Sequence, residues 1–157
     1  MTVPVVSESN HSGSFLERQV ELELRARGVM CRGYDEDRDN YDMFSAIWLI
    51  KRVPYKSLYG TEATSEFVLQ VQERRIRIEC RVQETPGSVD EKFPYLYMNA
   101  RDYMPEKEIV LVLSGNGARE RAVDWLKRAC DKVEHKRITV CSDWAEFRAW
   151  LKATLPK

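Results

Sequence analysis

The chain has 157 residues, enough for one domain built around one hydrophobic core. Hydrophobic residues make up 43% and charged residues 32%, which is typical of a globular protein, and no apolar run reaches the roughly 20 residues that a membrane helix needs. The formal net charge is zero, so a polyanionic partner would have to bind a local basic face.

The composition at the N-terminus predicts a disordered tail over residues 1–13, followed by a single domain over 14–157. This tail lacks the basic and apolar regions of a secretory signal. The four cysteines form no CxxC pair, and the two histidines, His11 and His135, are too few for a histidine-based metal site. We therefore expect a soluble cytoplasmic protein with reduced thiols, without membrane association or an organic cofactor.

The first predicted helix begins at Phe15, where Ser14 can act as its N-cap, and ends at Gly28. Residues 29–34 form a short segment of extended character, and the acidic residues 35–42 predict a solvated loop.

The next apolar run predicts a strand over residues 44–53, ended by Pro54. Residues 66–72 and 75–83 then alternate between apolar and polar side chains, so they predict a β-hairpin with its turn at Glu73-Arg74.

The second half of the chain predicts helices and strands in alternation. A helix capped by Ser88, with Glu91 completing a capping box, reaches about Arg101. The remaining predicted elements are a buried strand at 109–113, a turn at 114–117, a helix at 118–133, a strand at 138–141 and a final helix capped by Ser142. This order predicts a three-layer α/β fold, with a mixed central sheet between flanking helices.

The second hairpin strand separates two sets of side chains. Its apolar set is Ile76, Ile78, Cys80 and Val82, and its polar set is Arg77, Glu79, Arg81 and Gln83. Successive side chains point to opposite faces, so the polar set shares one face, near Glu66 of the preceding strand. Carboxylate and amide oxygens can hold Mg²⁺. Alternation alone also fits a strand with one solvated face.

From Phe15 to about Val133 the sequence resembles the PD-(D/E)XK nucleases. The segment FLERQVELELRARG offers a glutamate, Glu17, ahead of Gly28. SEFVLQ brings Glu66 where these nucleases usually have Asp, and IECRVQ matches the E-x-K signature with arginine in the lysine position. The segment GSVDEKFPYL has the form of the lysine-bearing helix of some branches.

This resemblance implies an αβββαβ core of restriction-endonuclease-like type and a Mg²⁺-dependent DNA endonuclease, in which Mn²⁺ can substitute. Arginine stays protonated and can clamp phosphate, but it is a poor proton shuttle. Compact relatives often act as homodimers, so a homodimer is also expected. The implied catalytic residues are Glu66, Glu79, Arg81, Gln83 and Lys92, and the implied metal ligands are Glu17, Glu66 and Glu79.

Cations around the hairpin, and the Gly-rich turn that opens the 118–133 helix, are the candidate DNA contacts. They are Lys51, Arg52, Lys56, Arg74, Arg75, Arg77, Asn116 and Arg119. Two alternatives stay open. One is a catalytically weak or inactive nuclease-like domain that binds DNA or a protein partner. The other is an interaction module whose contacts come from Trp125 and from Trp144 to Trp150.

Overall fold

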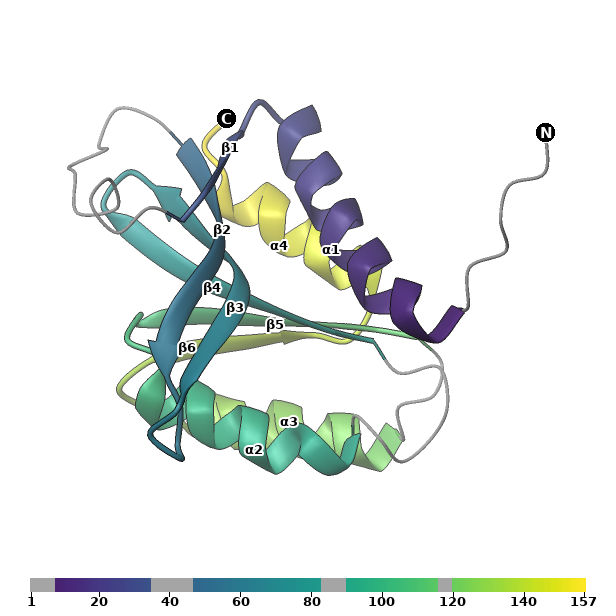
Figure 1. Ribbon diagram of the computed structural model, residues 1–157, viewed down its shortest axis with the longest axis vertical. Helices are drawn as coiled ribbons and strands as arrows, with labels where there is room; N and C mark the ends of the chain where they lie inside the picture. Colours follow the sequence, from purple (N-terminus) through teal and green to yellow (C-terminus); the bar gives the residue numbers. More distant parts are fainter. Residues whose placement is uncertain (1–7, 35–46, 83–89, 116–119) are drawn as a thin grey trace.

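The computed structural model describes residues 8–34, 47–82, 90–115 and 120–157. Its helices and strands alternate in the second half of the chain, as predicted (Figure 1). The helical elements are α1 (Glu8–Ala26), η1 (Asp90–Lys92), α2 (Phe93–Met98), η2 (Asn99–Tyr103), α3 (Glu120–Asp131) and α4 (Trp144–Thr154). The strands are β1 (Met30–Gly33), β2 (Ile47–Lys56), β3 (Glu62–Val71), β4 (Arg74–Val82), β5 (Glu108–Ser114) and β6 (Arg137–Cys141).

The six strands form one sheet in the order β1-β2-β3-β4-β5-β6. β2, β3 and β4 pair antiparallel, whereas β1 pairs parallel to β2, and β5 and β6 continue parallel to β4. The parallel pairs β4–β5 and β5–β6 need long connections, which contain α2 and α3 respectively. The sheet is therefore mixed, as the sequence predicted.

Helices cover both faces of the sheet (Figure 1). α1 and α4 lie on one face, where Leu24 and Phe147 join a core with Phe67 and Ile78. α2 and α3 lie on the other face, where their apolar side chains pack against β5 in a second core. The arrangement is an α/β fold of restriction-endonuclease-like type. None of the helices in the described ranges combines the length and apolar character that a membrane-spanning helix requires.

Helix α1 starts seven residues before the predicted start at Phe15, so Ser14 is not its N-cap. It therefore includes part of the segment assigned to a tail. A local capping preference is weak, and serine is only mildly unfavourable inside a helix. The predicted C-terminus is confirmed, because Gly28 has a φ of 85° and the amides of Gly28 and Val29 bond to the carbonyls of Arg25 and Leu24, as in a Schellman motif.

Strand β2 runs through Pro54 to Lys56, so the prediction that Pro54 ends the strand was wrong. β1 covers β2 only from Trp48 to Lys51, which leaves the later part of β2 at the sheet edge. A proline can occupy an edge strand because its missing N–H faces the unpaired side.

The hairpin turn lies one residue earlier than predicted. Val71 pairs with Arg74, so Gln72 and Glu73 form the two-residue loop, and Arg74 already belongs to β4. Gln72 adopts a φ of 54°, the left-handed conformation that tight hairpin turns require.

Two helix starts also differ from the predictions. Asp143, and not Ser142, is the N-cap of α4, since its side chain accepts from the amide of Glu146. α2 begins at Phe93 with Pro94 in its first turn, where a proline is tolerated. Ser88 and the loop predicted over residues 35–42 lie outside the described residues.

Candidate active site

The polar face of β4 is not a solvated surface. Arg77 and Glu79 are each only 1% exposed, while Ile76, Ile78 and Cys80 fill the core on the opposite face. The prediction that the two sets of side chains separate is thus confirmed. A buried charge is strongly unfavourable unless it is paired and hydrogen-bonded, so the interpretation of β4 as a strand with one wet face was wrong.

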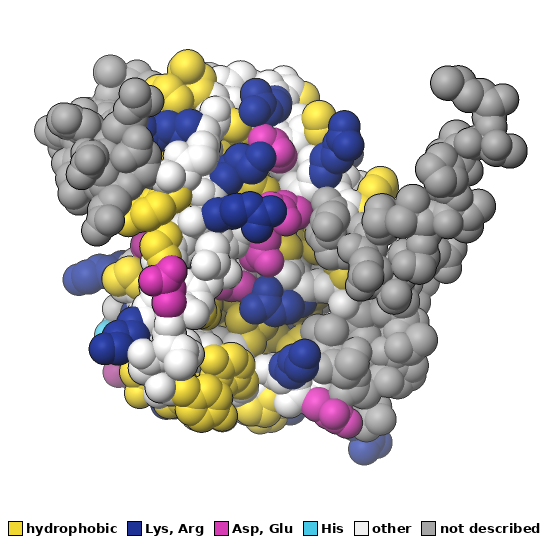
Figure 2. Space-filling model, in the orientation of Figure 1, with side chains coloured by type: hydrophobic (Ala, Val, Ile, Leu, Met, Phe, Trp, Pro, Cys, Tyr) yellow, Lys and Arg dark blue, Asp and Glu magenta, His cyan; other side chains and the backbone are white. Residues whose placement is uncertain are grey.

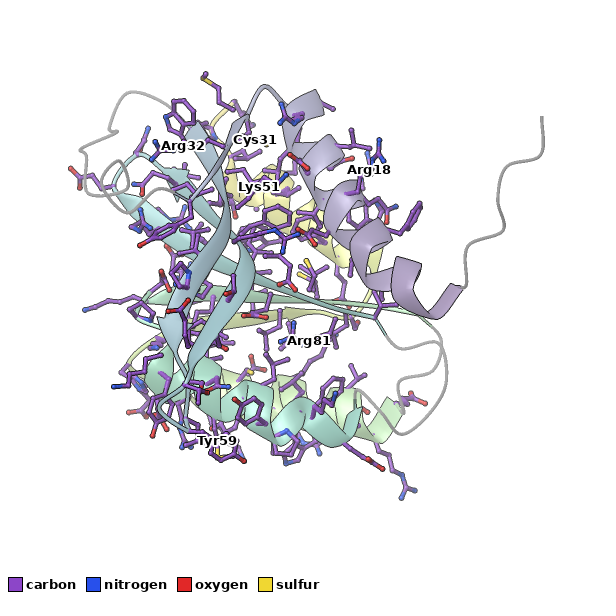
Figure 3. The ribbon with its side chains drawn as sticks, in the orientation of Figure 1. Arg18, Cys31, Arg32, Lys51, Tyr59 and Arg81 are labelled. Carbon is purple, nitrogen blue, oxygen red and sulfur yellow. The ribbon has the colours of Figure 1, made fainter. Side chains whose placement is uncertain are left out.

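Glu66, Glu79 and Arg81 converge on one point. The Nη1 atom of Arg81 lies 2.8 Å from Oε2 of Glu79 and 3.5 Å from Oε1 of Glu66. The same nitrogen donates a hydrogen bond of 2.8 Å to the carbonyl oxygen of Cys80. Figure 3 shows Arg81 between α1 and α2. Three oxygens from two strands therefore surround a single positive group.

The strand pairing explains this convergence. The register between β3 and β4 ends at Phe67 and Ile78, so Glu66 lies just beyond the last pair. A side-chain hydrogen bond joins the two strands there instead of backbone pairing. Oε2 of Glu66 accepts a hydrogen bond of 3.0 Å from the amide of Cys80. One carboxylate oxygen thus holds the two strands together, and the other faces Arg81.

The surroundings of Glu66 strongly change the pKa of its carboxyl group. Burial, and then the negative charge of Glu79, raise the pKa of Glu66 to about 7, although Arg81 and the amide of Cys80 act in the opposite direction. Burial would lower the pKa of Arg81, but Glu79 and Glu66 outweigh it and hold that pKa above its usual value. Burial and the charge of Glu79 also raise the pKa of nearby Tyr55 to about 12. The site therefore has an excess of negative charge that favours a cation.

The donor set fits a small divalent ion. Oε2 of Glu79 is buried and, among the described residues, has no hydrogen-bond partner, although it forms the ion pair with Arg81. Two carboxylates and the carbonyl of Cys80 supply oxygen, which Mg²⁺ prefers, and this ion usually keeps several waters. Glu66, Glu79 and the Cys80 carbonyl are thus the groups that could hold it.

Glu17, the third predicted ligand, does not complete this group. It pairs with Arg52, whose Nη2 atom lies 3.6 Å from Oε1 of Glu17. Within the described ranges, no three His, Cys, Asp or Glu side chains are placed to hold a metal ion together. Glu17 makes a small contribution to the raised pKa of the Cys80 thiol, which is caused mainly by burial.

The predicted DNA contacts differ in how free they are. Arg52 is 72% exposed, and its neighbour Lys51 pairs with Glu21 at 3.2 Å. Arg74 donates hydrogen bonds from Nε and Nη2 to the carboxylate of Glu108. Figure 2 shows acidic and basic side chains gathered in a band down the middle of one face, between α1 and α2. This band mixes the two charges, in keeping with the zero net charge.

The other predicted site residues lie apart from the carboxylates or beyond the described ranges. Lys92 and Lys56 are exposed, and in the described part of the chain no ion pair joins Lys92 to Glu66 or Glu79. Arg75 donates a hydrogen bond to Gln70. Gln83, Asn116 and Arg119 lie outside the described residues.

Arg77 is a correction to the predicted DNA interface. Because it is 1% exposed and forms a close ion pair with Glu106, it has no surface with which to reach DNA. Sequence reasoning also missed Ser65, which joins Arg77 to Glu79, and Glu106, which pairs with Arg77. A buried serine carries no motif, and Glu106 lies 29 residues from Arg77, so only the tertiary structure brings them together.

Comparison with known proteins agrees with this geometry. No curated protein matches the chain. A family model described as the PD-(D/E)XK nuclease superfamily domain matches residues 8–155, nearly the whole chain. The match covers all six strands and the three side chains that converge at the site. The chain therefore belongs to the PD-(D/E)XK nuclease superfamily.

Proposed function

We propose that the protein is a Mg²⁺-dependent endonuclease that hydrolyses phosphodiester bonds in DNA. The family implies a nuclease that acts on nucleic acid, and the choice of DNA and of endonucleolytic cleavage rests on the resemblance to restriction endonucleases and junction resolvases. The observation that carries the proposal is the convergence of Glu66, Glu79 and the Cys80 carbonyl on one cationic group.

The carboxylates would act as ligands. Glu79 approaches from β4 with a buried oxygen that has no hydrogen bond among the described residues, and Glu66 approaches from β3. A bound Mg²⁺ polarises a phosphoryl oxygen and lowers the pKa of a bound water. Mn²⁺, which takes similar oxygen ligands, should substitute. Glu17 pairs with Arg52 in this arrangement, and its role as a third ligand remains a prediction.

Arg81 would supply positive charge to the phosphate. Its side chain is 34% exposed, so part of it faces solvent while Nη1 contacts the carboxylates. A fixed cation stabilises the negative charge that develops in the transition state. Since arginine does not release its proton, a general base must come from elsewhere. Lys92 as an alternative source of positive charge, and Gln83 as the group that orients water or a ligand, remain predictions.

DNA binding would use cations on β2. Arg52 is exposed and Lys51 is partly buried, and they pair with Glu17 and Glu21 of α1. The opposing glutamates on α1 limit how strongly these cations attract phosphate. Homodimer formation, which would let each protomer cut one strand, remains a prediction from the resemblance.

A plasmid-nicking assay tests the proposal. Supercoiled DNA is incubated with the protein in Mg²⁺, in Mn²⁺ and in EDTA, and the same is done with Glu79→Gln. Wild type should nick or linearise the plasmid with either metal and not in EDTA. The variant should lose at least about a hundredfold in rate, because a ligand of the ion is removed.

Glu73→Gln is the matched control, because Glu73 is an exposed glutamate in the turn that precedes β4. It should cleave at the wild-type rate. Cleavage that persists in Glu79→Gln at the rate of this control would contradict the assignment of the site.

A second candidate is a nuclease-like domain that binds DNA without cutting it. It is favoured by Arg81, which already occupies the oxygens that a metal would need. The same assay separates the two candidates when it is combined with an electrophoretic mobility shift. Retarded DNA without cleavage in either metal would support the binder.

A further inference from the structure

A chain of buried polar contacts runs from Glu106 to the candidate metal ligand Glu79. Arg77 forms a two-pronged ion pair with Glu106, in which Nε lies 2.5 Å from Oε2 and Nη2 lies 2.9 Å from Oε1. Nη1 of Arg77 donates to Oγ of Ser65 at 2.9 Å, and this Oγ lies 2.5 Å from Oε1 of Glu79. Ser65 is fully buried.

All the donors of Arg77 are used, and this fixes which group donates and which accepts in each hydrogen bond of the series. Besides Glu106 and Ser65, Arg77 donates to the carbonyls of Val53 at 2.9 Å and Pro54 at 3.3 Å. These contacts account for all five N–H groups of a guanidinium. Because arginine can only donate, Ser65 must accept from it. The single hydroxyl proton of Ser65 is therefore left for Glu79.

The geometry holds Arg77 rigidly. Its guanidinium reaches across β3 to the carbonyls of β2, while the ring of Tyr55 stacks over it at 5.1 Å. Ser65 pairs with Val53 on β2, just beyond the point where the pairing of β3 with β4 ends. The hydroxyl thus connects the strands at the level of Glu79, where no backbone pair does so.

As a consequence, the two carboxylate oxygens of Glu79 have different partners. Oε1 receives the proton of Ser65, while Oε2 lies 2.8 Å from Arg81 and has no hydrogen bond within the described ranges. Holding Oε1 fixes the plane of the carboxylate. That plane determines where Oε2 points, and Oε2 is the oxygen that faces the candidate cation site.

We propose that Ser65 and Arg77 are positioning residues, which orient the Glu79 carboxylate so that its free oxygen faces the metal. This inference rests on the proposed function, since it assigns Glu79 as a ligand. A purely structural role of the Arg77–Glu106 ion pair would not require the contact between Ser65 and Glu79. Groups that orient a metal ligand through hydrogen bonds typically change metal affinity or activity by about 10- to 100-fold when they are removed.

Ser65→Ala tests the inference through metal binding in the absence of DNA. Mn²⁺ affinity is measured by electron paramagnetic resonance for wild type, Glu79→Gln and Ser65→Ala. We expect Ser65→Ala to bind Mn²⁺ about tenfold more weakly than wild type. In plasmid nicking its kcat should fall by about tenfold or more while KM for DNA stays unchanged, because no DNA contact is lost.

Ser57→Ala is the matched control. Ser57 is also buried, at 2% exposed, and its hydroxyl contacts Thr61 at 3.0 Å and not a site residue. It should keep wild-type Mn²⁺ affinity and kcat. Ser65→Ala values equal to those of this control would overturn the inference and leave the proposed function standing. A wild type that binds no Mn²⁺ would overturn the proposed function, and the inference with it.

If circular dichroism shows that Ser65→Ala is unfolded, a second pair of variants tests the role of the Ser65 hydroxyl. Ser65→Thr and Ser65→Val have nearly the same shape and differ in the hydroxyl. Tighter Mn²⁺ binding by the Thr variant, by about tenfold, would support the inference. Equal affinity in the two would overturn it.

Discussion

At the scale of single residues, the charge balance at Arg81 decides what the site can do. Two carboxylates of like charge lie close together in a buried setting, where they destabilise each other. Arg81 reduces this repulsion because it contacts both carboxylates, although its own partial burial is unfavourable. The same contacts occupy the oxygens that a divalent ion would use. Arginine in the lysine position therefore acts both as a neutralising partner and as a competitor for those oxygens.

Replacing this cation should separate metal binding from catalysis. Arg81→Ala leaves Glu66 and Glu79 without their partner, so we expect Mn²⁺ to bind at least about fivefold more tightly. Cleavage should nevertheless fall by about a hundredfold, because charge stabilisation at the phosphate is lost. Titration calorimetry with Mn²⁺ and single-turnover cleavage measure the two effects.

Arg81→Lys provides the comparison, since it restores the residue that the family usually has. It should retain both metal binding and cleavage, because a lysine supplies the positive charge. Weaker Mn²⁺ binding by Arg81→Ala than by wild type would show that Arg81 supports the ion instead of competing with it.

At the scale of elements, the position of β4 between β3 and β5 builds the site. β4 pairs antiparallel with β3 and parallel with β5, so its polar side chains lie between those of two neighbouring strands. The start of β4 is joined to β5 by Arg74, whose Nε and Nη2 lie 2.9 and 2.6 Å from the carboxylate of Glu108. The hydrogen bond from Arg74, acting against burial, lowers the pKa of Glu108.

This ion pair predicts a pH-dependent contribution to stability. A carboxyl whose pKa is lowered in the folded state stabilises the protein above its unfolded pKa, about 4.3 for Glu, and loses that effect as pH falls through the folded pKa. Glu108→Gln should therefore lower the free energy of unfolding by roughly 0.5 kcal/mol at pH 7, a value reduced by solvent screening. The difference from wild type should vanish near pH 3.

Urea denaturation at the two pH values measures this difference. Glu73→Gln, in the exposed turn, should show no difference at either pH. A Glu108→Gln destabilisation that stays the same at pH 3 would mean that the charge of Glu108 is not its source.

At the scale of the whole molecule, a chain with zero net charge would have to bind the proposed DNA substrate through a local group of cations. Acidic and basic side chains are mixed on the face that carries the site (Figure 2). Arg52, whose side chain is 72% exposed and pairs with Glu17, is one candidate contact that can reach a phosphate. Binding should therefore depend on few phosphate contacts.

Salt dependence tests this expectation. We expect the affinity for duplex DNA to rise as salt falls, with a shallow slope of log Kd against log salt. Arg52→Ala should weaken binding and reduce that slope by about one, the value for one lost phosphate contact. Fluorescence anisotropy in Ca²⁺, over a series of salt concentrations, measures both quantities.

Lys152→Ala is the control, because Lys152 is exposed on α4 and outside the predicted DNA contacts. Its slope should match that of wild type. An affinity that does not change with salt would contradict phosphate binding altogether.

Local pattern was sufficient for much of the fold. Period-two alternation identified β3 and β4 and separated Ile78 from Glu79, and the continuous apolar run identified β5. These patterns are reliable because side-chain direction repeats with the backbone. The errors concerned the ends of elements, such as the start of α1, the turn at Gln72 and the cap at Asp143, where several residue types satisfy the same local geometry.

The sequence by itself determined the family and the pair Glu66 and Glu79, because strand periodicity and motif order are local properties of the chain. Only the tertiary structure decided what their neighbours do. It buried Arg77, turned Glu17 toward Arg52, and joined Ser65 to Glu79 across two strands. Burial and long-range pairing depend on how the layers pack, so residue spacing alone cannot distinguish an arginine that binds DNA from one that orients a ligand.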